Sequence, residues 1–299
     1  MTKKRRLAYF LLLLTAVLWG FASPVIKYTL EFINPIPFLF YRFWLVSLIF
    51  LIPLIINLKK DHLSGQGFLK IFLTGILGGP LTLLLIFWGI DKTTSLSASL
   101  IVAMSPLFIV LGGAIFLKEK VTKKEQIGTV IALLGTIITI IQPSLGREGL
   151  NRSHLWGNFL IFIHNFVWAT YCILIKKESQ KYSPLILTAI TFISGVFVLT
   201  PLFFIQKIPL FEINSMAIPG ILYMSIFSSV VAYTTYNWGI SLIEASEATL
   251  FSYLQPLFAA PLAFFWLGEK ITLPFIIGAV IIAMGVYLTE SRGKNFSKI

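Results

Sequence analysis

Arg42 is the basic side chain that lies deepest within an apolar stretch of the chain, the run 35–57. If that run crosses a membrane, a cation near its middle costs roughly 2.5–3.5 kcal/mol and needs a partner or water. One interpretation is that Arg42 contacts an anion or a carboxylate inside a cavity. The other is that it extends toward the membrane surface and donates to carbonyl groups at a helix end.

Two tryptophans, Trp19 and Trp168, also lie well inside apolar runs. They are too deep for the aromatic belt that tryptophans form at membrane surfaces, which is the alternative, and a buried indole N–H requires an acceptor. His164 is four residues before Trp168 and shares its helix face, with Asn165 beside it. His164 could carry a proton, or it could be a neutral ring that donates to a backbone carbonyl. We expect these four residues to line a cavity.

Pro106 and Pro256 interrupt two further apolar runs. Proline removes a backbone donor and frees the carbonyl one turn earlier, which in a membrane must find a partner or face a wet cavity. We therefore expect two kinked helices that face a substrate and take part in gating, with Tyr253 and Gln255 making polar contacts. A kink that serves helix packing alone is the alternative.

Other chemistry finds little support in the composition. Cys172 is the single cysteine, and of the three His residues only His62 has an acidic neighbour, Asp61, which is too few ligands for a structural metal site. The acidic residues near the apolar runs fall at their ends, so no carboxylate relay for protons is visible. No nucleophile–base pair lies at membrane depth. We expect no catalytic residue, no metal and no cofactor.

The chain is predicted to be an all-α integral membrane protein. Hydrophobic residues make up 57% of its 299 residues and charged residues 12%, against about a quarter in a soluble protein. The net charge of +12 comes from short clusters between apolar runs, so nucleic acid is not expected as a partner. Ten runs can each cross a hydrocarbon core of about 30 Å as a transmembrane helix. They are 7–29, 35–57, 69–90, 94–117, 125–142, 156–175, 184–206, 217–240, 246–267 and 272–290.

The chain contains the same unit twice. Residues 95–140 align without a gap to residues 245–290, with Pro, Gly and Glu paired in one register. We expect two five-helix units, residues 1–146 and 147–299. The paired glycines should permit close helix contact, and each paired Glu should cap the N-terminus of the next helix. The pairs include Trp19/Trp168, Lys27/Lys176, Pro106/Pro256, Glu119/Glu269, Gly128/Gly278 and Gly135/Gly285.

Lys and Arg indicate the orientation. Seventeen of the 24 fall on the side of the N-terminus and six on the other, so both termini are expected in the cytoplasm. The run that follows the basic residues 3–6 is longer than that of a signal peptide and no clear cleavage site closes it, so we expect it to remain as the first helix. Five helices per unit make the units antiparallel. This is the inverted-repeat plan of secondary transporters, with a site near the midplane between the units.

These features resemble the EamA-type branch of the drug/metabolite transporter superfamily. The similarity rests on two five-helix units, on Trp19-Gly20 and Arg42-Phe43, on Pro in the fourth and ninth helices, and on a Leu-x-Glu…Gly…Gly closure of each unit. It covers nearly the whole chain. The resemblance implies fold and topology, and substrates as varied as aromatic amino acids, cysteine derivatives and drugs. Thr191 stands where the second unit would repeat Arg42, so any role of that cation is single.

We predict a secondary transporter that moves small organic solutes, amino acids or related amphipathic metabolites, across the cytoplasmic membrane by alternating access, with export as the expected direction. Multiply charged phosphates would require several convergent cations. A carrier for choline-like cations or for lipid or sugar precursors is the alternative, and it requires Trp19, Trp168 and Tyr253 to converge without Arg42. The expected partners are a small-molecule substrate and the lipid bilayer. A homodimer is compatible with the sequence, although no motif requires one.

Overall fold

The computed structural model describes residues 3–60, 63–116, 123–145, 152–207, 209–210, 212–243, 248 and 250–290. Every regular element in these ranges is helical, which confirms the predicted all-α class. Apolar runs become helices because backbone groups inside a bilayer must bond within their own segment. In this part of the chain six helices are long and apolar enough to cross a membrane, and three shorter apolar helices accompany them.

Six of the predicted runs correspond to single helices. The boundaries agree to within a few residues, because polar or proline-marked stretches end each run. These helices are α1 (Lys3–Thr29), α2 (Pro35–Lys60), α7 (Lys123–Leu145), α8 (Arg152–Glu178), α9 (Pro184–Ile205) and α14 (Leu273–Glu290).

Two other runs are continuous helices that contain a π-helical segment, which hydropathy does not predict. The segments lie at aligned positions of the two halves, and π-helical turns often accompany functional sites. The first run comprises α3 (Gly65–Ile76), η1 (Leu77–Leu81) and α4 (Thr82–Lys92). The second comprises η2 (Ser215–Ala217), α10 (Ile218–Ser225), η3 (Ile226–Val231) and α11 (Ala232–Leu242).

In each of the two runs that contain the paired prolines, one helix ends and another begins just before the proline. Pro106 is the second residue of α6 (Ser105–Phe116), which follows α5 (Ser95–Val102) after a turn, and Pro256 is the second residue of α13 (Gln255–Phe265), which follows η4 (Leu250–Leu254). Proline is well tolerated there, because the first N–H groups of a helix have no intrahelical acceptor. Each proline therefore begins a new helix.

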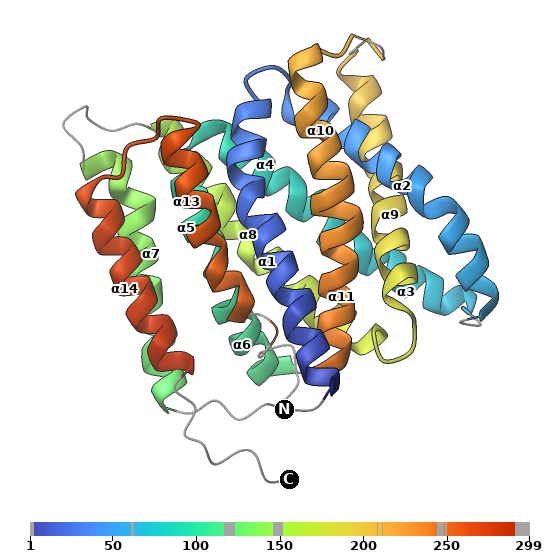
Figure 1. Ribbon diagram of the computed structural model, residues 1–299, viewed down its shortest axis with the longest axis horizontal. Helices are drawn as coiled ribbons and strands as arrows, with labels where there is room; N and C mark the ends of the chain where they lie inside the picture. The colour runs from blue at the N-terminus through green and yellow to red at the C-terminus, as the bar shows by residue number, and fades with distance from the viewer. Residues whose placement is uncertain are drawn as a thin grey trace.

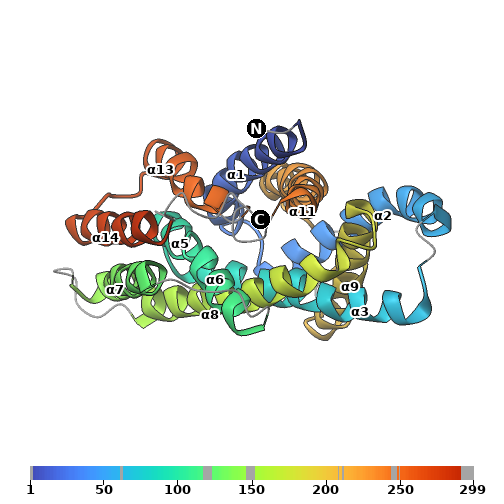
Figure 2. The ribbon, with the colours of Figure 1, turned by 90° about the horizontal axis from the view of Figure 1, so that it is seen from below.

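The helices form a bundle in which elements from both halves of the chain lie side by side (Figure 1). In two views, α7 and α14 form a pair at one side of the molecule, while α2, α3 and α9 lie at the opposite side (Figures 1 and 2). The predicted close helix contact occurs between α7 and α14: a Cβ on Gly285 would lie 2.4 Å from Ala132 N, and one on Gly135 would lie 2.8 Å from Ile282 N.

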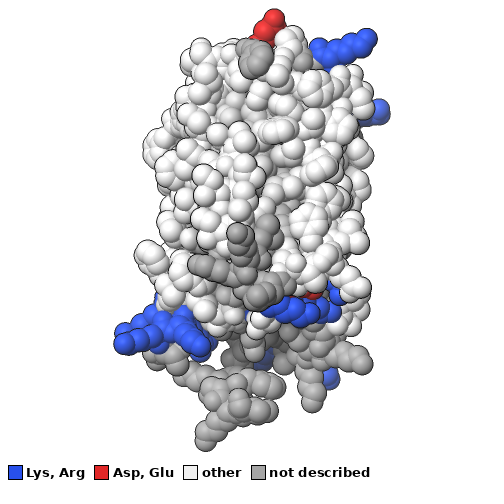
Figure 3. Space-filling view, turned by 90° about the vertical axis from the view of Figure 1, so that its right-hand side faces the viewer, with Lys and Arg blue, Asp and Glu red and all other residues white. Residues whose placement is uncertain are grey.

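Charged side chains gather at the two ends of the molecule. Figure 3 shows a broad band of other residues between these ends, with more Lys and Arg at the end where α1 begins. Large apolar side chains such as Ile52, Phe197 and Val280 are exposed. An apolar belt between two charged ends fits a hydrocarbon core between two aqueous surfaces.

Several contacts recur at aligned positions of the two halves. Lys27 donates from Nζ to Ile90 O at 3.1 Å, and Lys176 donates to Ile240 O. Both lysines end the first helix of their half and bond to the end of the third.

A glycine contact recurs in the same way. Gly89 lies against the Ile161 side chain, where a Cβ would be 2.4 Å from Cγ1, and Gly239 lies against Leu12, where a Cβ would be 2.7 Å from Cδ2. Leu12 and Ile161 occupy equivalent positions in α1 and α8. The first helix of each half therefore packs against the third helix of the other.

Candidate functional site

A cavity in which the centre of a water molecule can occupy about 70 Å³ lies between elements of both halves of the chain. Five of the seven predicted binding residues lie on its wall: Trp19, Arg42, His164, Trp168 and Gln255.

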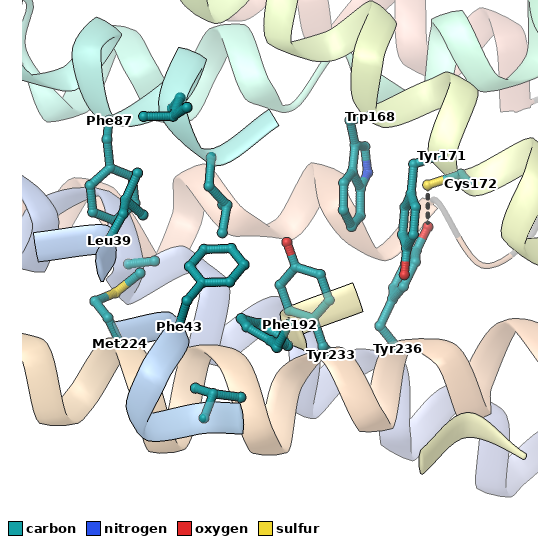
Figure 4. Close-up of a cluster of buried hydrophobic side chains, with 14 of the residues drawn as sticks. Leu39, Phe43, Phe87, Trp168, Tyr171, Cys172, Phe192, Met224, Tyr233 and Tyr236 are labelled. Atoms are coloured by element: carbon teal, nitrogen blue, oxygen red, sulfur yellow. Dashed lines mark hydrogen bonds between the residues drawn. The ribbon is translucent and has the colours of Figure 1, made fainter. Parts of the chain in front are cut away.

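The aromatic part of the wall is built around Trp19 and Trp168. Their rings meet edge to face with centroids 5.4 Å apart, and Tyr233 lies 5.4 Å from Trp19. Figure 4 shows Trp168, Tyr233 and Tyr236 from α8 and α11 side by side, with Phe192 beyond Tyr233. Trp168 is 7% exposed. Trp168 is buried and Trp19 is partly buried, so the two tryptophans form a cluster inside the bundle and not a belt at its surface.

The π-helical segments supply acceptors for this cluster. The indole N–H of Trp19 donates to Ser228 O in η3 at 3.0 Å, and the hydroxyl of Tyr233 donates to Gly78 O in η1 at 3.0 Å. Gly78 and Ser228 are aligned positions of the two halves. A π-helical turn interrupts the regular bonding of a helix, so its carbonyl groups can accept from side chains.

Arg42 lies on the cavity wall and does not extend to the membrane surface. It is 1% exposed, its Nε donates to Ser229 Oγ at 2.7 Å, and its Cζ lies 5.7 Å from the centre of the Phe87 ring. Ser229 in turn donates from Oγ to Met224 O at 2.7 Å. Its hydroxyl therefore presents a lone pair to Arg42 and holds the guanidinium in place.

His164 is held by α4. Its Nδ1 lies 2.8 Å from Thr82 Oγ1 and 3.0 Å from Thr82 O. A carbonyl oxygen can only accept, so these partners assign the proton to Nδ1. This geometry corresponds to the neutral ring that donates to a backbone carbonyl, and it leaves Nε2 as the acceptor that the ring can offer to the cavity.

Asn165 lies behind the wall, at the break between α5 and α6. Its Nδ2 donates to Ile101 O at 2.7 Å, and its Oδ1 accepts from Ser105 Oγ at 2.7 Å. Helix breaks change the donors that carbonyl groups receive, and Ile101 O accepts from the backbone N–H of Met104 as well as from Asn165. Ser105 itself lines the cavity, so Asn165 fixes a segment of the wall.

Tyr253 belongs to η4 and is not among the residues on the cavity wall, whereas Ser252 and Gln255 are. Sequence reasoning overlooked Ser228 and Ser229, which hold Trp19 and Arg42. The available signal was a pair of serines within an otherwise apolar run.

Comparison with known proteins identifies the chain. The sequence model of the EamA-like transporter family matches residues 6–141 and again residues 155–291. The chain belongs to the EamA-like transporter family. This confirms the resemblance and makes the protein a multi-pass membrane transporter.

Individual relatives agree with this assignment. This EamA-like transporter is 30% identical to the uncharacterized transporter YyaM of Bacillus subtilis over 289 residues, which cover 95% of this chain and 93% of YyaM. It is 28% identical to an uncharacterized transporter of Archaeoglobus fulgidus, with 95% and 97% of the two chains covered. A solved crystal structure matches with a TM-score of 0.70 at 14% identity and covers 95% of this chain and 96% of its own, which shows likeness of fold.

Proposed function

We propose that this EamA-like transporter moves small organic solutes, namely amino acids or related amphipathic metabolites, across the cytoplasmic membrane by alternating access, and that it exports them. The cavity carries this proposal, because its wall combines the rings of Trp19 and Trp168 with a few polar groups. Apolar walls with a few placed polar groups are typical of sites for amphipathic small molecules.

Residues 1–146 and 147–299 are in this proposal inverted repeats, and alternating access is a rocking of one against the other. The recurring contacts support it: Lys27 and Lys176 bond equivalent helix ends, and the π-helical segments η1 and η3 occupy aligned positions. A transporter of this plan opens the same cavity to each side in turn. Both termini are placed in the cytoplasm by the positive-inside rule.

A carrier for choline-like cations or for lipid or sugar precursors is the second candidate. An aromatic cage for a cation requires rings that converge away from a positive charge. Arg42 shares the wall with Trp19 and Trp168, and Tyr253 lies outside it, so the geometry favours neutral or anionic solutes.

The proposal is tested with purified protein in sealed liposomes that are incubated with a mixed pool of metabolites. Mass spectrometry then quantifies what enters, with empty liposomes and a Trp168→Ala variant as references. We expect enrichment of one chemical class that Trp168→Ala loses. Enrichment that survives this substitution would remove Trp168 from the substrate route, and no enrichment with or without a proton gradient would contradict transport of such solutes.

A further inference from the structure

Arg42 carries a positive charge that the described part of the chain leaves without a counter-ion. None of the carboxylates described pairs with it, and the guanidinium is fully inside the protein. Its Nε is bonded to Ser229, whereas its Nη1 is buried and has no hydrogen-bond partner among the described residues. A buried cation with an unused donor is unfavourable unless another group completes it.

Arg42 lies on the cavity wall, where two contacts hold its guanidinium. Ser229 occupies Nε, and Phe87 covers one face of the guanidinium. A guanidinium is a planar fork of donors that matches the two oxygens of a carboxylate. Arg42 lines the cavity and its Nη1 is a donor that no described residue occupies, so an acceptor that enters the cavity beside Arg42 would bond to this nitrogen.

The charge is single. At the position aligned with Arg42 the second half has Thr191, which packs against Gly79, the position aligned with Ser229. Among the residues that the structure describes, Arg42 is also the one Lys or Arg on the cavity wall. One fixed positive charge matches a substrate with one negative charge, whereas a multiply charged phosphate would need several cations on the wall.

We propose that Arg42 determines specificity by binding the carboxylate of a monocarboxylate substrate, whose apolar part lies against Trp19 and Trp168. This inference rests on the proposed function and adds the group that the substrate must carry. Amino acids and simple carboxylic acids share that group. Amino acids carry in addition an ammonium group, which can donate a hydrogen bond to Nε2 of His164.

The test is a matched set of probes offered to proteoliposomes as one mixture: L-phenylalanine, 3-phenylpropanoate, L-phenylalaninamide and phenethylamine, with the corresponding set built on L-leucine. We expect the members that carry a carboxylate to be enriched about 10- to 100-fold over the amides and amines, the range of a charged hydrogen bond. Arg42→Gln should abolish this preference and Arg42→Lys should retain part of it. Thr191→Val, at the aligned position, is the matched control and should leave the preference unchanged.

The outcomes separate the two proposals. Equal enrichment of acids and amides by the unaltered protein would overturn the carboxylate inference and leave transport standing, whereas enrichment of no probe by sealed vesicles would overturn both. A preference for the amino acids or for the simple acids supports the inference and identifies the source of the carboxylate. If Arg42→Gln does not fold, tryptophan fluorescence of the unaltered protein and of Arg42→Lys is titrated with 3-phenylpropanoate and L-phenylalanine. A saturable change that is weaker in Arg42→Lys supports the inference, and its absence with both acids contradicts it.

Discussion

Glu269 Oε1 accepts a hydrogen bond of 2.6 Å from the backbone N–H of Ser95, although the two residues lie in different halves of the chain. Its other oxygen accepts from the N–H of Leu96 at 2.9 Å. Glu269 therefore caps the N-terminus of α5. The expectation that it caps the helix that follows it, α14, is wrong, because both of its carboxylate oxygens bond to the start of α5. Its partner in the sequence repeat, Glu119, lies outside the described residues.

This cap yields a prediction about stability. A carboxylate that bonds two N–H groups at a helix N-terminus gains from both the hydrogen bonds and the helix dipole. Glu269→Gln removes the charge and one acceptor, and we expect it to lower the free energy of unfolding by about 1 kcal/mol. Thermal unfolding in detergent measures the effect, with Glu212→Gln on an exposed loop as the control. Equal losses in the two variants would show that the cap contributes nothing of its own.

His164 allows its two ring nitrogens to be tested separately. Asn places an amide N–H near the position of Nδ1 and can keep the bond to Thr82 O, whereas Gln places its amide near Nε2. We expect His164→Asn to keep the thermal stability of the protein but to lose any discrimination between the amino acids and the simple acids. We expect His164→Gln to lower the free energy of unfolding by about 1 kcal/mol. Thermal unfolding and the probe mixture described above measure these two effects. The reverse pattern would assign the proton to Nε2.

The α7–α14 contact depends on the absence of a side chain at Gly285. A Cβ there would lie 2.4 Å from Ala132 N and 2.6 Å from Gly128 O, so Gly285→Ala must separate the helices. We expect a loss of about 1–3 kcal/mol, the usual cost of overpacking. At Gly65 a Cβ would meet nothing within 4 Å, so Gly65→Ala is the control. Unchanged unfolding of Gly285→Ala would show that the helices do not pack this closely.

The proposed orientation is tested by labelling single introduced cysteines. Cys172 is 1% exposed, so a membrane-impermeant maleimide should not label the unaltered protein. Lys92→Cys, at the end opposite the start of α1, should react in intact cells, and Lys177→Cys should react only after lysis. Labelling of Lys177→Cys in intact cells would reverse the assignment of the two termini.

The positions of most helices follow from the amino-acid sequence alone. Apolar length and flanking polar residues are local properties, and a backbone in hydrocarbon has few alternatives to a helix. The alignment of the chain with itself also paired Lys27 with Lys176 and Gly135 with Gly285 before any contact was known. Five of seven candidate binding residues reached one cavity, because depth in a membrane and polarity together restrict where a side chain can be satisfied.

Contacts between distant side chains, in contrast, depend on how the helices pack. Ser229 is 187 residues from Arg42, and Ser228 is 209 residues from Trp19, so no local pattern predicts either bond. Both serines lie in η3, and the two π-helical segments have no shared sequence signal, since Pro80 occurs in η1 and η3 has no proline. Tyr253 and Gln255 were indistinguishable by composition, yet only Gln255 lines the cavity. The rotation of one helix against another sets these outcomes, and that rotation depends on packing between segments far apart in the chain.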